Sequence, residues 1–387
     1  METVLYRFNP WWEKEPEWRF IPREKYLNRL KQYLHTKDVV IITGLRRVGK
    51  TTIMKMMIKE LLKQGIPPGK IFYISLDFYS LERFSILDII EEFFKLQKIS
   101  FSEKVYLFLD EVAYKKDFQI QLKNLYDLYN AKVFASSSSA SILRDRKAML
   151  TGRERVIEVL PLDFKEYLLF KNLKIPKSDK HLLEVYFEDY MQIGGIPEYV
   201  LTEDPEYLKQ LIDDVLYKDI ISFHGVKEKA LLREFFRLLM ERSGKQVSLN
   251  RISRILNISV DTARRFLGYF EEAFIIHGIE RCGKLNERLK APKKIYAGDV
   301  GIRNIFTGFR DKGAVFENLV FLQIKNQKPC YIYKDGIELD FLTEDGTLIE
   351  VKYGQQLNEK QKKLFESFNA KKKVVISDIE DYLSLIT

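Results

Sequence analysis

Near its amino end the chain reads Val39-Val40-Ile41-Ile42-Thr43-Gly44-Leu45-Arg46-Arg47-Val48-Gly49-Lys50-Thr51-Thr52. The β-branched residues at the start of this segment predict a buried strand, and apolar residues at Ile53, Met57 and Leu61 predict a helix after it. Between strand and helix lies the spacing Gly-x-x-x-x-Gly-Lys-Thr, which is the complete phosphate-binding loop pattern in its expected context. We therefore expect this segment to bind a nucleoside triphosphate.

The residues of this loop have separate expected roles. Gly44 and Gly49 let the backbone wrap closely around phosphates, because a Cβ would obstruct left-handed or crowded conformations. Backbone N–H groups and the N-terminus of the following helix would face the anion. Lys50 would pair with the β- and γ-phosphates, and the Thr51 hydroxyl would hold Mg²⁺. The expected nucleotide-binding set is Gly44, Leu45, Arg46, Arg47, Val48, Gly49, Lys50, Thr51 and Thr52.

A second buried run, residues 105–109, leads into the pair Asp110-Glu111. An acid at the carboxyl end of such a strand can reach Mg²⁺ directly or through water, so we assign Asp110 to the metal. The next carboxylate can orient and deprotonate an attacking water, so we assign Glu111 as the general base. An ordinary strand that ends in an acidic turn is the alternative. The pair favours hydrolysis over nucleotide binding alone.

Polar residues follow the next predicted strand, residues 131–135, which ends in the four serines 136–139. A polar side chain at this place would sense the γ-phosphate, and Ser138 is our candidate. One of the arginines farther along, Arg144, Arg146 or Arg153, could stabilise transition-state charge. We choose Arg153, with surface solvation as the alternative.

The composition describes a folded chain of two or three domains, with 387 residues of which 46% are hydrophobic. No apolar run reaches the length that spans a bilayer, and the start lacks the apolar region of a signal peptide. The two cysteines, Cys282 and Cys330, are too few for a disulfide framework or a Cys/His zinc site. We expect a cytoplasmic protein that does not act at a membrane.

The formal net charge is +9, and nearly all of it lies between residues 229 and 294, where fifteen Lys and Arg face seven Asp and Glu, a net of +8. The elements predicted in this segment are a helix at 234–242, two helices capped by Ser248 and Ser259, and strands at 274–281 and 292–296. This is helix-turn-helix geometry with a wing, and Arg264 and Arg265 lie on the exposed face of the third helix. The charge favours binding to the DNA backbone, while a structural or protein-binding module is the alternative.

After residue 298 the pattern changes to a small α/β domain. Its predicted elements are a helix at 313–326, strands at 330–333, 338–342 and 348–352, a helix at 359–368 and a strand at 373–377. Within it, Glu317, Asp340, Glu350 and Lys352 resemble the PD-(D/E)xK nuclease core. Asp340 and Glu350 would lie side by side and hold Mg²⁺, and Lys352, on the same strand face as Glu350, could deprotonate a metal-bound water. Solvated acids and lysines on a nuclease-like scaffold are the alternative.

Motifs spread over nearly the whole chain resemble one known family. They are Asn9-Pro10-Trp11-Trp12, the loop 44–52, Leu109-Asp110-Glu111, Gly152-Arg153, Pro161-Leu162-Asp163-Phe164-Lys165-Glu166-Tyr167 and Gly194-Gly195-Ile196-Pro197-Glu198-Tyr199. In this order they resemble the archaeal and bacterial AAA-type ATPases of uncharacterised role. The resemblance implies an ASCE-type parallel sheet with a helical lid, and a C-terminal domain similar to the nuclease core.

The expected fold is therefore α/β, with an ATPase core at 1–160, a helical lid at 161–228, a winged helix-turn-helix at 229–297 and a nuclease-like domain at 298–387. The expected function is that of an Mg²⁺-dependent ATPase that acts on or at DNA through the winged helix. The expected cofactors and partners are ATP, Mg²⁺ and DNA, and homo-oligomers are possible. The alternative is a nucleotide-gated regulatory protein whose winged helix binds a protein and whose C-terminal domain is not catalytic.

Overall fold

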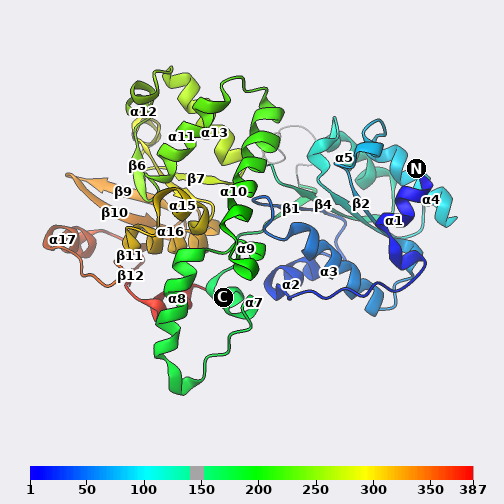
Figure 1. Cartoon of the computed structure of the whole chain (residues 1–387), viewed down its shortest axis with the longest axis horizontal. Coiled ribbons are helices and arrows are strands. Elements are labelled where there is room, and N and C mark those ends of the chain that lie inside the picture. Colours follow the sequence, from blue (N-terminus) through cyan, green and yellow to red (C-terminus); the bar gives the residue numbers. More distant parts are fainter. Residues whose placement is uncertain (140–151, 387) are drawn as a thin grey trace. The chain divides into compact units, whose positions relative to one another are not determined.

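The computed structural model describes residues 1–139 and 152–386 (Figure 1). The chain divides into two compact units, Met1–Val159 and Leu160–Thr387. Across the described residues we find no helix with the length and apolar character that crossing a membrane requires.

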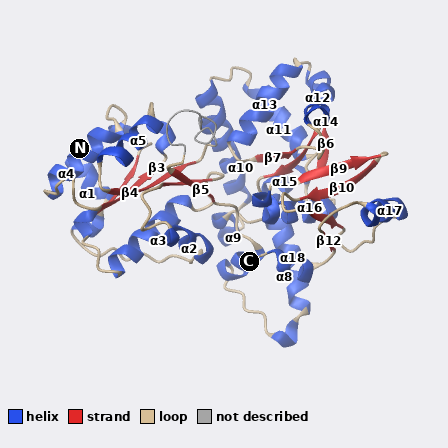
Figure 2. Cartoon of the chain, turned by 180° about the vertical axis from the view of Figure 1, so that it is seen from behind, coloured by secondary structure: helices blue, strands red, loops and turns tan. Residues whose placement is uncertain are grey.

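The first unit contains a five-stranded parallel sheet with the strand order β2-β3-β4-β1-β5. Its strands are β1 (Val39–Thr43), β2 (Ile71–Ser75), β3 (Val105–Asp110), β4 (Ala131–Ser137) and β5 (Glu154–Glu158). The main helices are α1 (Glu2–Phe8), α2 (Glu24–Gln32), α3 (Lys50–Lys63), α4 (Ile86–Gln97) and α5 (Phe118–Leu128), and they cover both faces (Figure 2). This order is typical of ASCE-type phosphate-loop domains, so the predicted sheet is confirmed.

Alternation along the strands separates the two faces of this sheet. Phe72, Ile74 and Leu107 belong to the apolar core that α1, α4 and α5 cover. The residues that alternate with these on β2 and β3, which include Tyr73 and Asp110, therefore point to the opposite face, toward α3. Tyr73 and Asp110 thus lie on the same face of the sheet.

The second unit begins with helices: α7 (Phe164–Phe170), α8 (His181–Ile193), α9 (Pro197–Thr202), α10 (Pro205–Asp214) and the π-helix η6 (Val215–Ser222). The basic segment then forms α11 (Lys229–Met240), β6 (Lys245–Val247), α12 (Leu249–Leu256), α13 (Val260–Glu272), β7 (Ile276–Ile279), α14 (Leu285–Lys290) and β8 (Lys293–Ala297). Its three strands form an antiparallel sheet of order β6-β8-β7. The expected caps are present, because the Ser248 side chain accepts from the Arg251 N–H and that of Ser259 from the Thr262 N–H.

The remaining elements are α15 (Val300–Thr307), α16 (Lys312–Ile324), β9 (Cys330–Lys334), β10 (Ile337–Leu342), β11 (Thr347–Val351), α17 (Glu359–Ser367), β12 (Lys372–Ile376) and α18 (Ile379–Leu385). The strands form a mixed sheet of order β12-β11-β10-β9, in which only β11 and β12 are parallel. One core joins Tyr167 and Tyr190 near the start of this unit to Tyr296 on β8 and to Phe316 and Tyr331 farther on. The three segments of the second unit therefore fold around shared apolar side chains.

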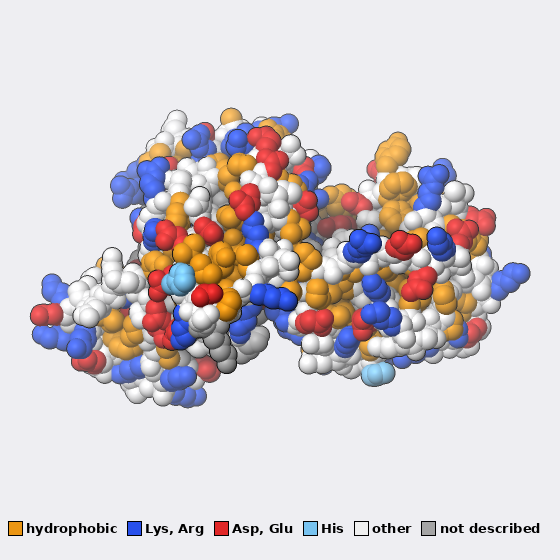
Figure 3. Space-filling model, turned by 60° about the horizontal axis from the view of Figure 1, so that its bottom comes forward, with side chains coloured by type: hydrophobic (Ala, Val, Ile, Leu, Met, Phe, Trp, Pro, Cys, Tyr) orange, Lys and Arg blue, Asp and Glu red, His pale blue; other side chains and the backbone are white. Residues whose placement is uncertain are grey.

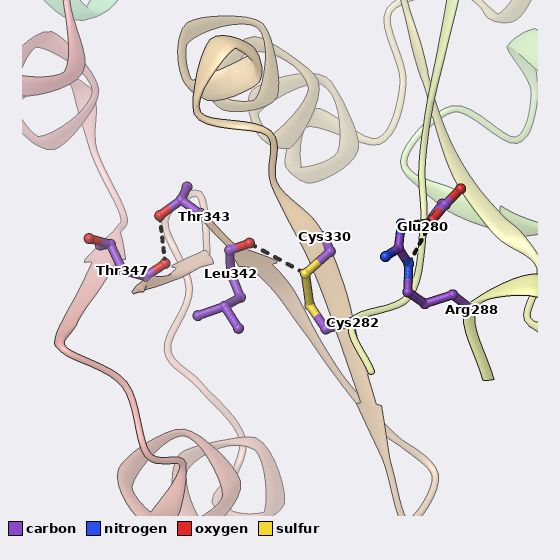
Figure 4. Close-up of a disulfide and its surroundings, with 7 residues drawn as sticks. All are labelled: Glu280, Cys282, Arg288, Cys330, Leu342, Thr343 and Thr347. Atoms are coloured by element: carbon purple, nitrogen blue, oxygen red, sulfur yellow. Dashed lines mark hydrogen bonds and ion pairs between the residues drawn. A yellow bond between two sulfur atoms is a disulfide. The ribbon is translucent and has the colours of Figure 1, made fainter. Parts of the chain in front are cut away.

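A disulfide joins Cys282, just after β7, to Cys330 at the start of β9 (Figure 4). The backbones also pair here, because the Cys282 N–H donates to the Tyr331 carbonyl at 2.7 Å and the Tyr331 N–H to the Glu280 carbonyl at 3.0 Å. Two cysteines are too few for a disulfide framework, but they form this single bond, which was not predicted from the sequence. The bond ties the basic segment covalently to the C-terminal sheet.

Candidate functional site

The loop after β1 has the backbone that its glycines predict. Gly44 has φ +135°, and a Cβ there would lie 2.3 Å from the carbonyl oxygen of Val159. Gly49 has φ +98°, a conformation that side-chain-bearing residues rarely adopt. Substitution of either glycine would therefore distort the loop.

Lys50 is the first residue of α3 and is only 5% exposed. Its Nζ donates to the carbonyl oxygens of Gly44 and Leu45, each at 3.0 Å. The ammonium and the N-terminus of a 14-residue helix thus lie at the same loop. Both favour a bound anion at this place.

The Asp110 carboxylate, 2% exposed at the end of β3, is surrounded by hydroxyl groups. Its Oδ2 accepts from Thr51 Oγ1 at 2.6 Å and from the Tyr73 hydroxyl at 2.8 Å, and its Oδ1 accepts from Ser136. A hydroxyl and a carboxylate in contact are the oxygen ligands that Mg²⁺ prefers. The structure therefore brings Thr51 and Asp110 together as the sequence predicts. It adds Tyr73 and Ser136, which the sequence reasoning missed.

Glu111 follows directly and has φ +54°. Its Oε2 accepts from the Ser138 hydroxyl at 3.1 Å and from the Ser138 N–H at 3.2 Å, while its own N–H donates to Ser136 Oγ at 3.0 Å. Burial raises the pKa of the Glu111 carboxyl, and the nearby Lys50 charge partly opposes this rise. A raised pKa makes a carboxylate a better proton acceptor near neutral pH. Ser138 therefore lies at the site, in contact with the candidate base.

Arg153 lies elsewhere. Its guanidinium pairs with Asp127 at 3.0 Å and stacks over the ring of Tyr126. It precedes β5, whose first residue is in register with Val39, so it lies at the amino end of the strands. The phosphate loop follows the opposite, carboxyl end of β1. Because β1 has five residues, its two ends are about 16 Å apart. The prediction that Arg153 serves this loop within its own chain is therefore wrong; Arg144 and Arg146 lie outside the described residues.

The C-terminal residues predicted to form a metal site do meet. Glu317 comes from α16, Asp340 from β10 and Glu350 from β11. The Asp340 N–H donates to Glu350 Oε2 at 3.0 Å, and Lys352 Nζ lies 3.0 Å from Glu350 Oε1. Burial, and then the charge of Asp340, raises the pKa values of Glu317 and Glu350 to about 7.

The centre of this acidic cluster is occupied by Lys294, a residue of β8 that is 1% exposed. Its Nζ lies 2.7 Å from Glu317 Oε1, 2.6 Å from Glu338 Oε1 and 2.9 Å from Asp340 Oδ1. Burial alone would lower the pKa of Lys294, but the acidic groups around it, Asp340 and Glu317 foremost, together raise this pKa well above its usual value. The described residues contain no group of three or more His, Cys, Asp or Glu arranged to hold a metal ion. The predicted metal site is thus corrected, because the chain supplies its own cation.

Models of known protein families match three stretches of the chain. Residues 36–168 match the model of an AAA domain, 184–313 that of a domain of unknown function (DUF8612), and 312–385 that of a second such domain (DUF4143). The chain therefore carries an AAA-type phosphate-loop ATPase domain followed by two domains of unknown function.

Similar whole proteins carry no assigned activity. An uncharacterized protein of Methanocaldococcus jannaschii is 28% identical over 88% of this chain and 80% of its own length. An uncharacterized protein of Haemophilus influenzae is 27% identical over 79% of this chain and 78% of its own length. Among solved structures, AMPPCP-bound DnaA from Aquifex aeolicus covers 66% of this chain and 93% of its own, at 21% identity and a TM-score of 0.29, too low to support a functional conclusion.

Proposed function

We propose that this chain is an Mg²⁺-dependent ATPase. The observation that carries the proposal is the hydrogen bond from Thr51 Oγ1 to Asp110 Oδ2 at 2.6 Å, which joins the helix after the phosphate loop to the strand end that precedes Glu111. The residues fit ATP with Mg²⁺, since Gly49 has the left-handed backbone that the loop requires, Lys50 lies at the N-terminus of α3, and the donor set is hydroxyl plus carboxylate. Thr51 and Asp110 would hold the metal, which would neutralise charge on the phosphates.

Within this proposal the chain's own groups perform the proton chemistry. Glu111 accepts a proton from the water that attacks the γ-phosphorus, and the bond from phosphorus to the β–γ bridging oxygen breaks. Ser138 holds the Glu111 carboxylate in place, and Lys50 pairs with the phosphates. The test is release of phosphate from ATP by the purified chain with Mg²⁺ and with EDTA. Turnover that needs Mg²⁺ supports the proposal, and its absence at every metal concentration contradicts it.

The second part of the proposal is that the ATPase acts at DNA. The order α11-β6-α12-α13-β7-α14-β8 fits a winged helix in which α14 lies between the two strands of the wing, and Arg264 and Arg265 are exposed on α13. On the face in Figure 3 basic and acidic side chains are mixed, so the support comes from the local +8 of residues 229–294. Binding would be sequence-tolerant and steeply salt-dependent. If affinity did not change with salt, a protein-binding module would be the better interpretation.

The C-terminal domain would then be a nuclease-like scaffold that does not cleave DNA. The position of Lys294 supports this part of the proposal, because its ammonium neutralises the carboxylates that a nuclease would use to bind a metal ion. The test is incubation of linear and supercoiled DNA with Mg²⁺ or Mn²⁺. Cleavage that is lost in Asp340→Ala and Lys352→Ala would contradict the scaffold and restore the nuclease.

A further inference from the structure

The strand β2 lies at the edge of the first unit's sheet, and its outward backbone groups need partners. In the described part of the chain those partners are side chains from the segment after α1. The Asn9 amide donates to the Tyr73 carbonyl at 2.9 Å and accepts from the Tyr73 N–H at 2.7 Å. The indole N–H groups of Trp11 and Trp12 donate to the Ile71 carbonyl at 3.1 and 3.0 Å. Asn9 thus acts as a strand peptide would.

The residue that Asn9 fixes is the one that reaches the candidate nucleotide site. Tyr73 is 4% exposed, and its hydroxyl donates to the same Asp110 oxygen that Thr51 contacts. Asn9 itself is fully buried, and its amide also donates to the Leu5 carbonyl at 2.7 Å. A continuous set of hydrogen bonds therefore leads from α1 through Asn9 and Tyr73 to Asp110.

We propose that Tyr73 is a positioning residue for Asp110, and that Asn9 holds Tyr73 in that role. The inference rests on the proposed ATPase function and adds residues to it. If the Thr51 hydroxyl held a metal instead of donating to Asp110, Tyr73 and Ser136 would still hydrogen-bond to the Asp110 carboxylate and orient it. Groups that orient a metal-binding carboxylate in this way affect metal affinity strongly.

The test measures binding of a fluorescent ATP analogue to the full chain, without metal and across an Mg²⁺ titration. Tyr73→Phe should leave metal-free affinity within about twofold, while the Mg²⁺ concentration for half-maximal effect rises about tenfold. The control is Tyr106→Phe, which removes a hydroxyl from a buried tyrosine on β3 whose ring lies beside Lys104. This control should behave as the wild type does.

The Asn9 step has its own matched pair. Asn9→Ala removes both bonds to Tyr73 and should shift the Mg²⁺ dependence in the same direction by a smaller factor. Trp12→Phe removes one donor to Ile71, leaves the Asn9 bonds and should not shift it. Thermal unfolding of each variant separates loss of stability from loss of metal affinity.

The possible results distinguish failure of the inference from failure of the proposed function. If the wild type gains nucleotide affinity with Mg²⁺ and Tyr73→Phe gains it equally, the inference is overturned and the proposed ATPase stands. If Trp12→Phe shifts the Mg²⁺ dependence as much as Asn9→Ala, the Asn9 step is overturned. If Mg²⁺ does not change nucleotide binding by the wild type, the proposed function is overturned, and the inference with it.

Discussion

Two sites in this molecule each bring a lysine to a place rich in acids, and they satisfy those acids in different ways. At the phosphate loop, Lys50 donates to backbone carbonyls, and the nearby Asp110 carboxylate is met by hydroxyl groups. In the C-terminal acidic cluster, Lys294 lies within 2.9 Å of three carboxylate groups. The Asp110 carboxylate therefore has neutral partners, whereas the carboxylates of the C-terminal cluster surround a buried ammonium.

The two sites differ in how readily a metal ion could bind to their carboxylates. A hydroxyl that contacts a carboxylate can become a metal ligand itself, so in the proposed function Thr51 and Asp110 would take up Mg²⁺ without displacing a charged group. A metal at the acidic cluster must first displace a buried ammonium, and an unpaired buried charge is strongly unfavourable. Motifs show which acids meet, while the cation that neutralises them can come from any part of the chain.

The largest expected effect is on hydrolysis at the first site. Glu111→Gln should lower turnover by about 10²- to 10⁴-fold, because a general base contributes that much, while ATP affinity is retained. Lys50→Ala should instead abolish nucleotide binding or hydrolysis. Phosphate release and equilibrium nucleotide binding measure the two effects. Rapid hydrolysis by Glu111→Gln would show that Glu111 is not the base.

Next in size is the stability of the acidic cluster. Lys294→Met should destabilise the second unit by about 3–5 kcal/mol, because it leaves buried carboxylates without their counter-charge. The control is Lys293→Met, whose half-exposed ion pair with Glu271 should contribute about 1 kcal/mol or less. Denaturant unfolding measures both. Equal costs for the two variants would remove the contrast between the sites.

A smaller effect is expected from pH. Glu317 and Glu350 have pKa values raised to about 7, against 4.5 for an ordinary glutamate, so the folded chain binds more protons than the unfolded chain between these values. Stability from these carboxyls is therefore fully present below about pH 4.5 and is lost as pH rises through about 7. Glu317→Gln and Glu350→Gln should each flatten the profile of unfolding free energy against pH. An unchanged profile in both variants would contradict this.

The smallest effect compares cations of the basic segment with each other. Arg264→Ala with Arg265→Ala should weaken DNA binding, and each of the two arginines that pairs with a phosphate should account for about 1 in the salt slope. In protein that remains folded, Lys294→Met should leave the slope unchanged, since the Lys294 ammonium is buried against acids. DNA affinities measured at several salt concentrations give the salt slope of each variant. A slope that responds to Lys294 and not to the arginines would reverse the assignment of exposed and buried charge.

Local patterns predicted much of the fold and part of the site. The parallel strands, the loop glycines and the caps at Ser248 and Ser259 follow from periodicity and from residue types a few positions apart. Thr51 and Asp110 were predictable together because each belongs to a motif with a known partner.

The missed residues act over long separations. Tyr73 lies 37 positions from Asp110, and Lys294 lies 46 from Asp340. Strand alternation could have placed Tyr73 on the Asp110 face, and the step of two from Ser138 to Ser136 was also a usable signal. Nothing in the local pattern distinguishes Lys294 from Lys293, because only packing of β8 against the C-terminal domain buries one of them.

The comparison between the two sites can be tested by counting bound metal. Mn²⁺ is added to the full chain with a non-hydrolysable ATP analogue, and the bound ion is measured by electron paramagnetic resonance. We predict one bound Mn²⁺ for each chain, lost in Asp110→Asn and retained in Asp340→Asn. A second Mn²⁺ that depends on Asp340, or Mn²⁺ binding that does not depend on Asp110, would contradict it.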